Sequence, residues 1–406
     1  MQLHPLQLPS YTWYITKRKI ESVLLWPLIA IGRCWGFLQP LPKQYEGVLF
    51  FPFYHTGGAE KVHSQIVQAL AAVQPNLLVV FTRRSVDTTF LSAFEVSGID
   101  VIDISRKVDG FKNLAVNVLY RGKIAQQLSQ QRRCKWVFNG QCNFAYKLSI
   151  WLPKRIKQYE LIHSFNSFSW IRIPYIECYE VSVTVNQDIV DKHSAQLNAR
   201  KAPYQVVNRL TFKHTGIEVQ AVSVNSNKYV ATPLRVLYVG RGTEEKRVHL
   251  NAKLAAKLAA IAPNTFEFHF AGDVAHAIPI SLQKYCVLHG DIKEKQQLNS
   301  LYSDCHVLLM LSSTESGPLV TMEAMLSGLV VISTNVGFAY KSLDADQVVD
   351  VSTNDDALIE SVTSKLLVLN NDRMRLKTIG LKNHEVAKTT FDENGFKNFI
   401  VGLLNI

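Results

Sequence analysis

Two carboxylates stand close together in a stretch whose pattern predicts a strand, a turn and a helix. The apolar run at 307–311 has the length of a strand buried on both faces, and Gly317-Pro318 predicts the turn into a helix. Glu315 falls in the loop before that helix and Glu323 lies inside it, flanked by apolar residues. The free backbone amides between them favour a phosphate. A carboxylate at Glu323 needs a partner, whereas a solvated surface position is the alternative for both glutamates.

Two cations follow a second predicted strand, at 234–239. The strand leads directly into Gly240-Arg241-Gly242-Thr243-Glu244-Glu245-Lys246. This is not a dinucleotide fingerprint, because no third glycine opens a helix there. Arg241 and Lys246 could instead neutralise the charge that develops on a diphosphate leaving group, without a metal. Surface ion pairs with the adjacent glutamates are the alternative.

Further candidate residues stand at strand ends nearer the N-terminus. Gly57 and Gly58 separate a predicted strand at 47–53 from a predicted helix at 59–72, and such a pair lets a ligand approach the helix N-terminus. His163 ends a predicted strand at 160–163, on the sheet edge where α/β folds bind ligands. A purely structural histidine is the alternative.

Together these segments resemble glycosyltransferase family 4, the retaining GT-B enzymes also described as glycosyl transferases group 1. The resemblance covers most of residues 46–404. It rests on Glu315, seven residues, Glu323, then Ala324-Met325-x-x-Gly328-x-Val330-Val331 and Gly337, and on Gly-Arg, four residues, Lys at 240–246.

The resemblance implies a role for each candidate residue. Glu315 would contact the sugar hydroxyls of the donor and Glu323 its ribose, while Arg241 and Lys246 hold the diphosphate. His163 would touch the donor sugar near the reacting carbon. The implied catalytic residues are His163, Arg241, Lys246 and Glu315, and the implied nucleotide-sugar-binding residues are Gly57, Gly58, Arg241, Lys246, Glu315, Gly317, Pro318, Leu319, Val320 and Glu323.

Two departures from the family pattern concern specificity. Ser316-Gly317-Pro318 replaces the usual Gly-Phe-Pro, which affects the sugar, and Asn139-Gly140-Gln141 replaces a His-x-His strand end, which affects the acceptor side.

The expected fold class is α/β. Strands alternate with helical segments, which predicts parallel sheets. The resemblance implies a GT-B fold with two Rossmann-like domains facing a cleft and a C-terminal helix crossing back to the first domain. The expected division is a basic and apolar extension at 1–45, an acceptor domain at 46–215, a nucleotide-sugar donor domain at 216–385 and the returning helix at 386–406. The polar stretch at 205–232 is expected to be the irregular connection.

The N-terminal extension carries a basic flank, Lys17-Arg18-Lys19, before an apolar run of about ten residues, Val23 to Ile31. The run is too short to span a bilayer, which needs about 20 residues. Contact with a membrane surface and packing as a helix on the first domain are both open. Residues 111–159 contain ten bases and no acid, which suits an anionic membrane surface, and no recognition motif for nucleic acid accompanies them.

Cysteine and histidine spacing excludes several classes of site. The six cysteines are scattered, without a Cys-x-x-Cys pair, which favours a reducing compartment. The 12 histidines have no metal-ligand spacing, and Asp344-Ala345-Asp346 does not directly follow a strand. We therefore expect no metal and no cofactor.

The sequence favours a metal-independent glycosyltransferase. It would move a sugar from a nucleotide-sugar to a glycan or lipid-linked acceptor in cell-surface polysaccharide or glycolipid synthesis, in the cytoplasm or peripherally on the inner face of the membrane. A catalytically silent GT-B-fold subunit of a glycosyltransferase complex is the alternative. A serine hydrolase is excluded because no Gly-x-Ser-x-Gly motif is present.

Overall fold

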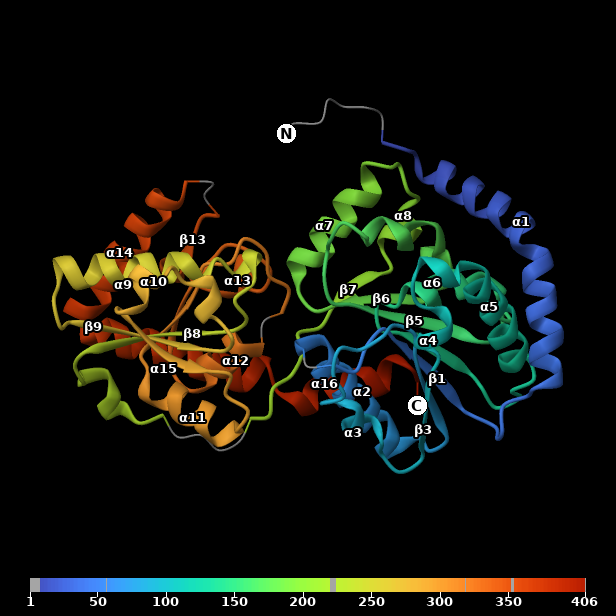
Figure 1. The fold of residues 1–406 in the computed structure, drawn as a ribbon, viewed down its shortest axis with the longest axis horizontal. Helices are drawn as coiled ribbons and strands as arrows, with labels where there is room; N and C mark the ends of the chain where they lie inside the picture. The colour runs from blue at the N-terminus through green and yellow to red at the C-terminus, as the bar shows by residue number, and fades with distance from the viewer. Residues whose placement is uncertain (1–7, 56, 220–223, 318, 352–353, 406) are drawn as a thin grey trace. The chain divides into compact units, whose positions relative to one another are not determined.

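The computed structural model of the protein describes residues 8–55, 57–219, 224–317, 319–351 and 354–405. The chain divides into two compact units. Unit 1 comprises residues 1–213 and 396–406, and unit 2 comprises residues 214–395 (Figure 1).

Unit 1 is built on a seven-stranded parallel sheet with the strand order β3-β2-β1-β4-β5-β6-β7. Its central strands are continuous apolar runs because both faces of the sheet are covered. On β1, Leu49 and Phe51 face α2, while Val48 and Phe50 face α5. The strands are β1 Gly47–Phe51, β2 Leu77–Phe81, β3 Ile99–Asp103, β4 Trp136–Asn139, β5 Lys157–Ile162, β6 Val181–Thr184 and β7 Leu210–Phe212.

Helices cover both faces of this sheet (Figure 1). The α-helices of unit 1 are α1 Tyr11–Leu38, α2 Gly58–Val73, α3 Leu91–Phe94, α4 Ser105–Val108, α5 Leu114–Ser129, α6 Asn143–Leu148, α7 Gln187–Asn198 and α8 Tyr204–Val207. The 3₁₀ helices are η1 Phe111–Asn113, η2 Ser149–Trp151 and η3 Ser169–Cys178.

The last helix of the chain, α16 (Glu393–Leu403), returns the chain to unit 1. Phe396, Ile400 and Leu404 are buried in the same cluster as β1 and α2. The chain rejoins unit 1 at residue 396, against the 386 expected from the sequence.

Unit 2 is built on a six-stranded parallel sheet with the order β10-β9-β8-β11-β12-β13. One face of its central strands packs on α9, and the other on α12. The strands are β8 Leu234–Val239, β9 Phe266–Ala271, β10 Cys286–Gly290, β11 Val307–Met310, β12 Val330–Thr334 and β13 Val348–Val349. The helices are α9 Val248–Ile261, α10 Ile280–Gln283, α11 Lys295–Asp304, α12 Leu319–Leu326, α13 Ala339–Ser342, α14 Asp355–Asn371 and α15 Arg373–Thr390, with η4 Ser226–Val230, η5 Glu244–Lys246, η6 Ala275–Ala277 and η7 Ala345–Gln347.

Two sequence predictions are wrong. The stretch at 205–232 is not wholly irregular, because it contains β7 and η4. The segment that carries the N-terminal apolar run is not too short to span a bilayer, because the run is part of the 28-residue helix α1. Within the described residues α1 is the one helix that is long and apolar enough to cross a membrane, judged by length and composition.

Helix α1 lies against α5 through glycines. A Cβ atom added at Gly32 would stand 2.1 Å from the carbonyl oxygen of Leu119, and one at Gly36 would stand 2.3 Å from that of Lys123. From the other side, a Cβ at Gly122 would stand 2.3 Å from the carbonyl oxygen of Ile29. The two backbones therefore touch directly, which only glycine permits.

Candidate functional site

Lys246 and Glu315 meet at the carboxyl edge of the unit 2 sheet. β8 and β11 are neighbours in that sheet, and the two residues lie in the segments that follow them. The Lys246 ammonium donates to Glu315 Oε1 at 2.6 Å, and the Ser312 hydroxyl donates to the same oxygen at 2.7 Å. The two charged side chains are only 18% and 8% exposed. The structure thus brings together two of the predicted site residues that are 69 positions apart.

Backbone contacts fix the loop that carries Glu315. Ser313 N donates to the carbonyl of Glu245 at 2.8 Å, and Phe338 N donates to the carbonyl of Ser316 at 3.0 Å. Gly337 has a left-handed φ of 55°, and a Cβ there would stand 2.4 Å from the carbonyl oxygen of Glu315. The segments after β8, β11 and β12 therefore form one cross-linked edge.

Arg241 lies at the same edge of the unit 2 sheet, outside the contact between Lys246 and Glu315. Its side chain is exposed, and its carbonyl accepts a hydrogen bond from the Tyr238 hydroxyl at 2.9 Å. Gly240 before it lies so close to the neighbouring loop that a Cβ at Gly272 would stand 1.9 Å from the Gly240 carbonyl oxygen. The backbone of Arg241 is thus fixed, while its guanidinium points into solvent-accessible space.

Glu323 has the polar partner that its apolar flanks require. It lies on α12, half-buried, and the Tyr302 hydroxyl of α11 donates to Glu323 Oε2 at 3.2 Å. Burial, and then the carboxylate of Glu323, raise the pKa of Tyr302 well above its usual value of 10. Tyr302 therefore stays protonated and serves as a donor.

The remaining predicted residues of unit 2 surround the start of α12. Gly317 and Val320 are half-buried, and Leu319 is buried in the core. Pro318 lies outside the described residues.

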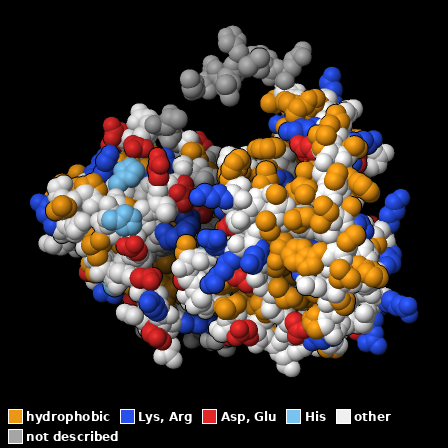
Figure 2. Space-filling view, turned by 45° about the vertical axis from the view of Figure 1, so that its right-hand side comes forward, with side chains coloured by type: hydrophobic (Ala, Val, Ile, Leu, Met, Phe, Trp, Pro, Cys, Tyr) orange, Lys and Arg blue, Asp and Glu red, His pale blue; other side chains and the backbone are white. Residues whose placement is uncertain are grey.

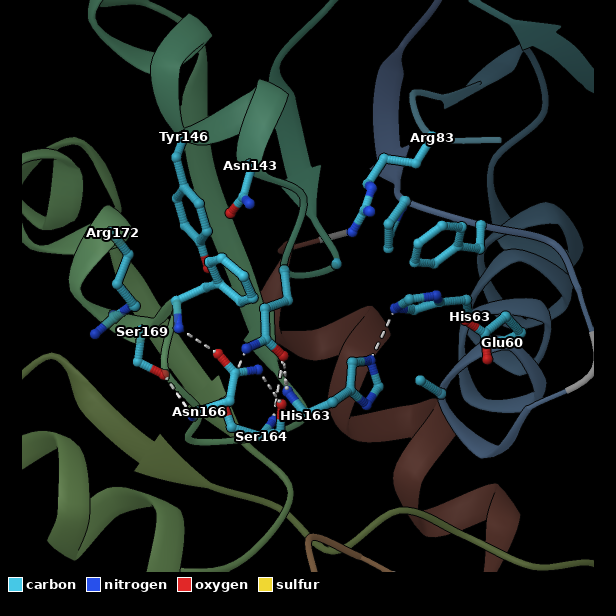
Figure 3. Close-up of a pocket in the computed structure, with 16 residues that line it drawn as sticks. Glu60, His63, Arg83, Asn143, Tyr146, His163, Ser164, Asn166, Ser169 and Arg172 are labelled. Atoms are coloured by element: carbon cyan, nitrogen blue, oxygen red, sulfur yellow. Dashed lines mark hydrogen bonds between the residues drawn. The ribbon is translucent and has the colours of Figure 1, made fainter. Parts of the chain in front are cut away.

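Unit 1 contains a cavity of about 230 Å³ at the carboxyl edge of its sheet (Figure 3). Polar side chains of several kinds converge on it. Its lining comprises Pro52, Phe53, Ala59, Glu60, His63, Arg83, Gly140, Gln141, Asn143, Tyr146, His163, Ser164, Asn166, Phe168, Ser169 and Arg172.

Two imidazoles form one wall of this cavity. His163 follows β5 and His63 lies on α2, and their Nε2 atoms stand 2.8 Å apart (Figure 3). Burial lowers the pKa of His163 to about 4, and burial together with His163 holds the pKa of His63 well below 6.5. Both rings are therefore neutral near pH 7, one donating to the other. His63 also stacks on Phe51, with ring centroids 4.1 Å apart.

Gln141 positions the backbone at His163. Its side-chain oxygen accepts the N–H groups of His163 at 2.8 Å and Ser164 at 3.2 Å. Its own backbone adopts a left-handed φ of 59°. A Cβ at Gly140 would stand 2.5 Å from His63 Nε2, so this position admits only glycine. The departure from His-x-His thus supplies residues that shape the cavity.

The predicted glycine turn lies at the start of α2. Gly57 is the residue before the helix, and a Cβ there would stand 2.2 Å from a carboxylate oxygen of Glu60. Space around Gly58 is open, because a Cβ added there would meet no heavy atom of the described residues within 4 Å. Glu60 is buried, and His55 Nε2 lies 3.8 Å from it. The turn therefore faces a buried carboxylate as well as a helix N-terminus.

Sequence reasoning noted Gln141 only as part of the departure from His-x-His, and it did not identify His63, Arg83 and Tyr302. His63 carried one signal, because it stands three residues after Glu60 and so shares a helical face with it. The others carried none, since their roles depend on contacts between distant segments.

Among the described residues, no group of three or more His, Cys, Asp or Glu side chains is placed so that it could hold a metal ion. Asp344 pairs with Lys382 at 2.6 Å, and Asp346 pairs with Arg375.

Residues 222–382 match the family model described as glycosyl transferases group 1. The matched segment covers most of unit 2. The match covers the edge that holds Arg241, Lys246, Glu315 and Glu323, and it ends before the chain returns to unit 1.

Solved structures share the fold over most of the chain. Alr3699/HepE of Anabaena, in complex with UDP and glucose, is 14% identical, with a TM-score of 0.64 over 89% of this chain and 100% of that chain. Sucrose-phosphate synthase of Thermosynechococcus elongatus is 16% identical, with a TM-score of 0.67 over 89% and 98%. The fold is GT-B, as the sequence predicted.

One curated relative resembles a shorter part of the chain. An uncharacterized 41.2 kDa protein in the cps region of Klebsiella pneumoniae is 30% identical over 112 residues. The aligned segment spans 28% of this chain and 30% of the relative's length.

Proposed function

We propose that the protein is a retaining glycosyltransferase that moves a sugar from a nucleotide-sugar donor to a glycan or lipid-linked acceptor. The observation that carries the proposal is the contact between Lys246 and Glu315 at the carboxyl edge of the unit 2 sheet, within the matched segment. A cation beside a carboxylate, in a mostly buried position, suits a donor that presents diphosphate and sugar hydroxyls side by side.

The chemistry follows from how charge develops. When the glycosidic bond breaks, negative charge accumulates on the diphosphate oxygen that leaves. Lys246 and Arg241 would neutralise that charge in place of a metal. Glu315 holds Lys246 in position, and its carboxylate can accept hydrogen bonds from sugar hydroxyls.

Glu323 would bind the ribose of the donor. Its carboxylate accepts from Tyr302, which leaves further lone pairs for ribose hydroxyls. Gly317 to Val320, at the start of α12, would contribute backbone amides to the phosphates. Pro318 is the exception, because proline has no backbone N–H to donate.

Unit 1 would contribute the acceptor side and, through His163 and the glycine turn, further contacts to the donor. Neutral His163, fixed by His63 and Gln141, can hydrogen-bond a sugar hydroxyl without adding a charge. The glycine turn at Gly57 and Gly58 would let phosphates approach the start of α2.

The comparisons support the donor class and the setting. The Anabaena structure holds UDP and glucose, and the Klebsiella relative is encoded in a cps region. We therefore place the reaction in cell-surface polysaccharide or glycolipid synthesis, in the cytoplasm or peripherally on the inner face of the membrane. All six cysteines are free thiols, which fits a reducing compartment.

A binding screen followed by a transfer assay tests the proposal. Nucleoside diphosphates and their sugars should raise the melting temperature, since a ligand at 100 times its Kd adds about 2.7 kcal/mol. Transfer to a glycan or lipid-linked acceptor should persist in excess EDTA. Loss of transfer with EDTA, restored by Mn²⁺ or Mg²⁺, would contradict the metal-free mechanism. Donor binding without transfer to any acceptor tested would instead favour the silent subunit.

A further inference from the structure

The outer face of α1 is apolar along most of its length. Eight large hydrophobic side chains of this helix are exposed: Trp13, Ile20, Val23, Leu24, Trp26, Ile31, Phe37 and Leu38. Figure 2 shows hydrophobic side chains gathered over the side of unit 1 that carries α1, with lysines and arginines around the border. Few soluble surfaces present such a continuous apolar area without a partner.

Most charged residues of α1 lie near its beginning. From Ser22 to Leu38 the sequence has a single charged residue, Arg33. Its guanidinium donates to the Trp151 carbonyl at 2.9 Å, on the side that faces unit 1. Lys17 and Lys19 are exposed in the earlier turns. The exposed face therefore changes from basic to uncharged and apolar along the helix.

The inner face of α1 is held to unit 1 at both ends. Near the start, Tyr11 and Tyr14 are buried with Ile173 of η3, and Arg18 donates to the Pro174 carbonyl. Near the end, Gly32 and Gly36 touch the backbone of α5. A helix attached along one side in this way can insert its other side into a membrane, but it cannot cross a membrane without leaving unit 1.

A basic hollow of about 140 Å³ lies beside the early turns of α1. Lys17, Arg18 and Lys147 line it together with Trp170, and Glu21 is the acid among its lining residues. Glu21 lies 3.7 Å from Lys17, which leaves an excess of positive charge. Burial, and then the positive charge of Arg121 on α5, lower the pKa of Lys147. The hollow suits a phosphate, held by cations and covered by an aromatic ring.

We infer that α1 is an in-plane membrane anchor whose uncharged face enters an anionic bilayer while the Lys17–Lys147 hollow receives a lipid headgroup phosphate. The occupant is an anionic lipid surface, because the apolar face and the basic hollow adjoin one another on the same helix. The inference rests on the proposed membrane location of the acceptor and adds how the protein attaches.

Vesicle co-sedimentation of the full-length protein tests the apolar face. Val23→Glu/Leu24→Glu alters two side chains that are 74% and 73% exposed, so it should not disturb folding. Val230→Glu is the matched control, because Val230 on η4 of unit 2 is also 74% exposed. We expect wild type and control to bind vesicles of phosphatidylglycerol and phosphatidylcholine, and the double variant to bind at least about tenfold more weakly.

The hollow is tested by lipid charge. Lys147→Gln should reduce binding to anionic vesicles severalfold more than Lys253→Gln, which removes an exposed charge from α9. Neither variant should change the weaker binding to pure phosphatidylcholine. Equal effects of the two substitutions would overturn the phosphate site.

The in-plane arrangement is tested by fixing α1 to α5. The ring centroids of Trp35 on α1 and Tyr120 on α5 lie 5.2 Å apart. Cysteines at these two positions, in the variant Trp35→Cys/Tyr120→Cys with Cys34→Ser, can therefore be bridged with a short bis-maleimide. We expect bridged and unbridged protein to bind vesicles equally. Loss of binding on bridging would show that α1 leaves unit 1, and absence of vesicle binding by wild type would overturn the anchor altogether.

The membrane result can be separated from the proposed activity. All variants should keep the wild-type rise in melting temperature with nucleoside diphosphate, because none alters unit 2 near Lys246. Failure of vesicle binding with that rise intact would reject the anchor alone.

Discussion

The Nε2 atoms of His63 and His163 lie 2.8 Å apart, so one neutral imidazole donates a hydrogen bond to the other across the wall of the unit 1 cavity. Protonation of both rings would break this arrangement, because two imidazolium groups would face each other with donors only. The pair thus couples the shape of the cavity to pH.

Stability should fall as the pH drops from about 6.5 toward 4. Burial lowers the folded-state pKa of His163 to about 4, so between these pH values the unfolded chain binds more protons than the folded protein. We expect His163→Gln to lessen the loss of unfolding free energy between pH 7 and 5 by on the order of 1–2 kcal/mol. Urea unfolding at both pH values measures this. His276→Gln, at an exposed position, is the control and should retain the wild-type slope.

Removal of the unit 2 cations should slow transfer. Arg241→Ala and Lys246→Ala should each lower kcat/KM about 10²- to 10³-fold, because contacts that strengthen as the leaving group charges are lost. Lys257→Ala, which breaks a surface pair with Glu360, should have wild-type kinetics.

The Lys246–Glu315 contact predicts a coupling between two substitutions. Since each residue holds the other, the losses in Lys246→Ala and Glu315→Gln should not add in the double variant. Strict additivity of the free energies would show that the two side chains act separately.

Glu323 and Tyr302 should control nucleotide affinity. Glu323→Gln should weaken both the nucleoside diphosphate and the full donor, and Tyr302→Phe should weaken both to a smaller extent, because the carboxylate loses its positioning hydrogen bond. Glu315→Gln should weaken the donor and leave the nucleoside diphosphate nearly unchanged. Calorimetry with the two ligands separates these roles, and equal losses for both ligands in the Glu315 and Glu323 variants would contradict them.

Gly337 should tolerate no side chain. Gly337→Ala places a Cβ 2.4 Å from the Glu315 carbonyl in a left-handed conformation, so it should destabilise the protein by about 1–3 kcal/mol and weaken donor binding. Gly402→Ala is the contrasting change, because it lies on α16 with open space around it. It should be neutral or stabilise by up to about 1 kcal/mol. Thermal unfolding with and without ligand measures both.

Continuous apolar runs made much of the fold predictable. The bounds of β8 coincide with the expected strand at 234–239, and β11 ends one residue before the end of the expected strand at 307–311, because both are apolar runs that are almost wholly buried. β7 gave no such signal, since its three residues are half-buried or exposed. Only part of α1 was predicted, because Lys17 to Lys19 interrupt the apolar pattern while the helix continues on its packed side.

Strand order limits what the sequence can predict about the sites. Spacing could assign Lys246 and Glu315 to loops at sheet edges, but their contact depends on β8 and β11 being neighbours, which no local pattern specifies. His63 is a similar case. A buried histidine within a helix looks like a core residue until β5 brings His163 to it.

The return of α16 to unit 1 determines when that unit can be completed during synthesis. Phe396, Ile400 and Leu404 belong to the buried cluster of β1 and α2, yet they leave the ribosome after the whole of unit 2. Unit 2, from His214 to Gly395, can therefore fold while unit 1 still lacks part of its core. A premature stop just after Gly395 would leave a finished unit 2 attached to an open first unit, exposed to proteolysis.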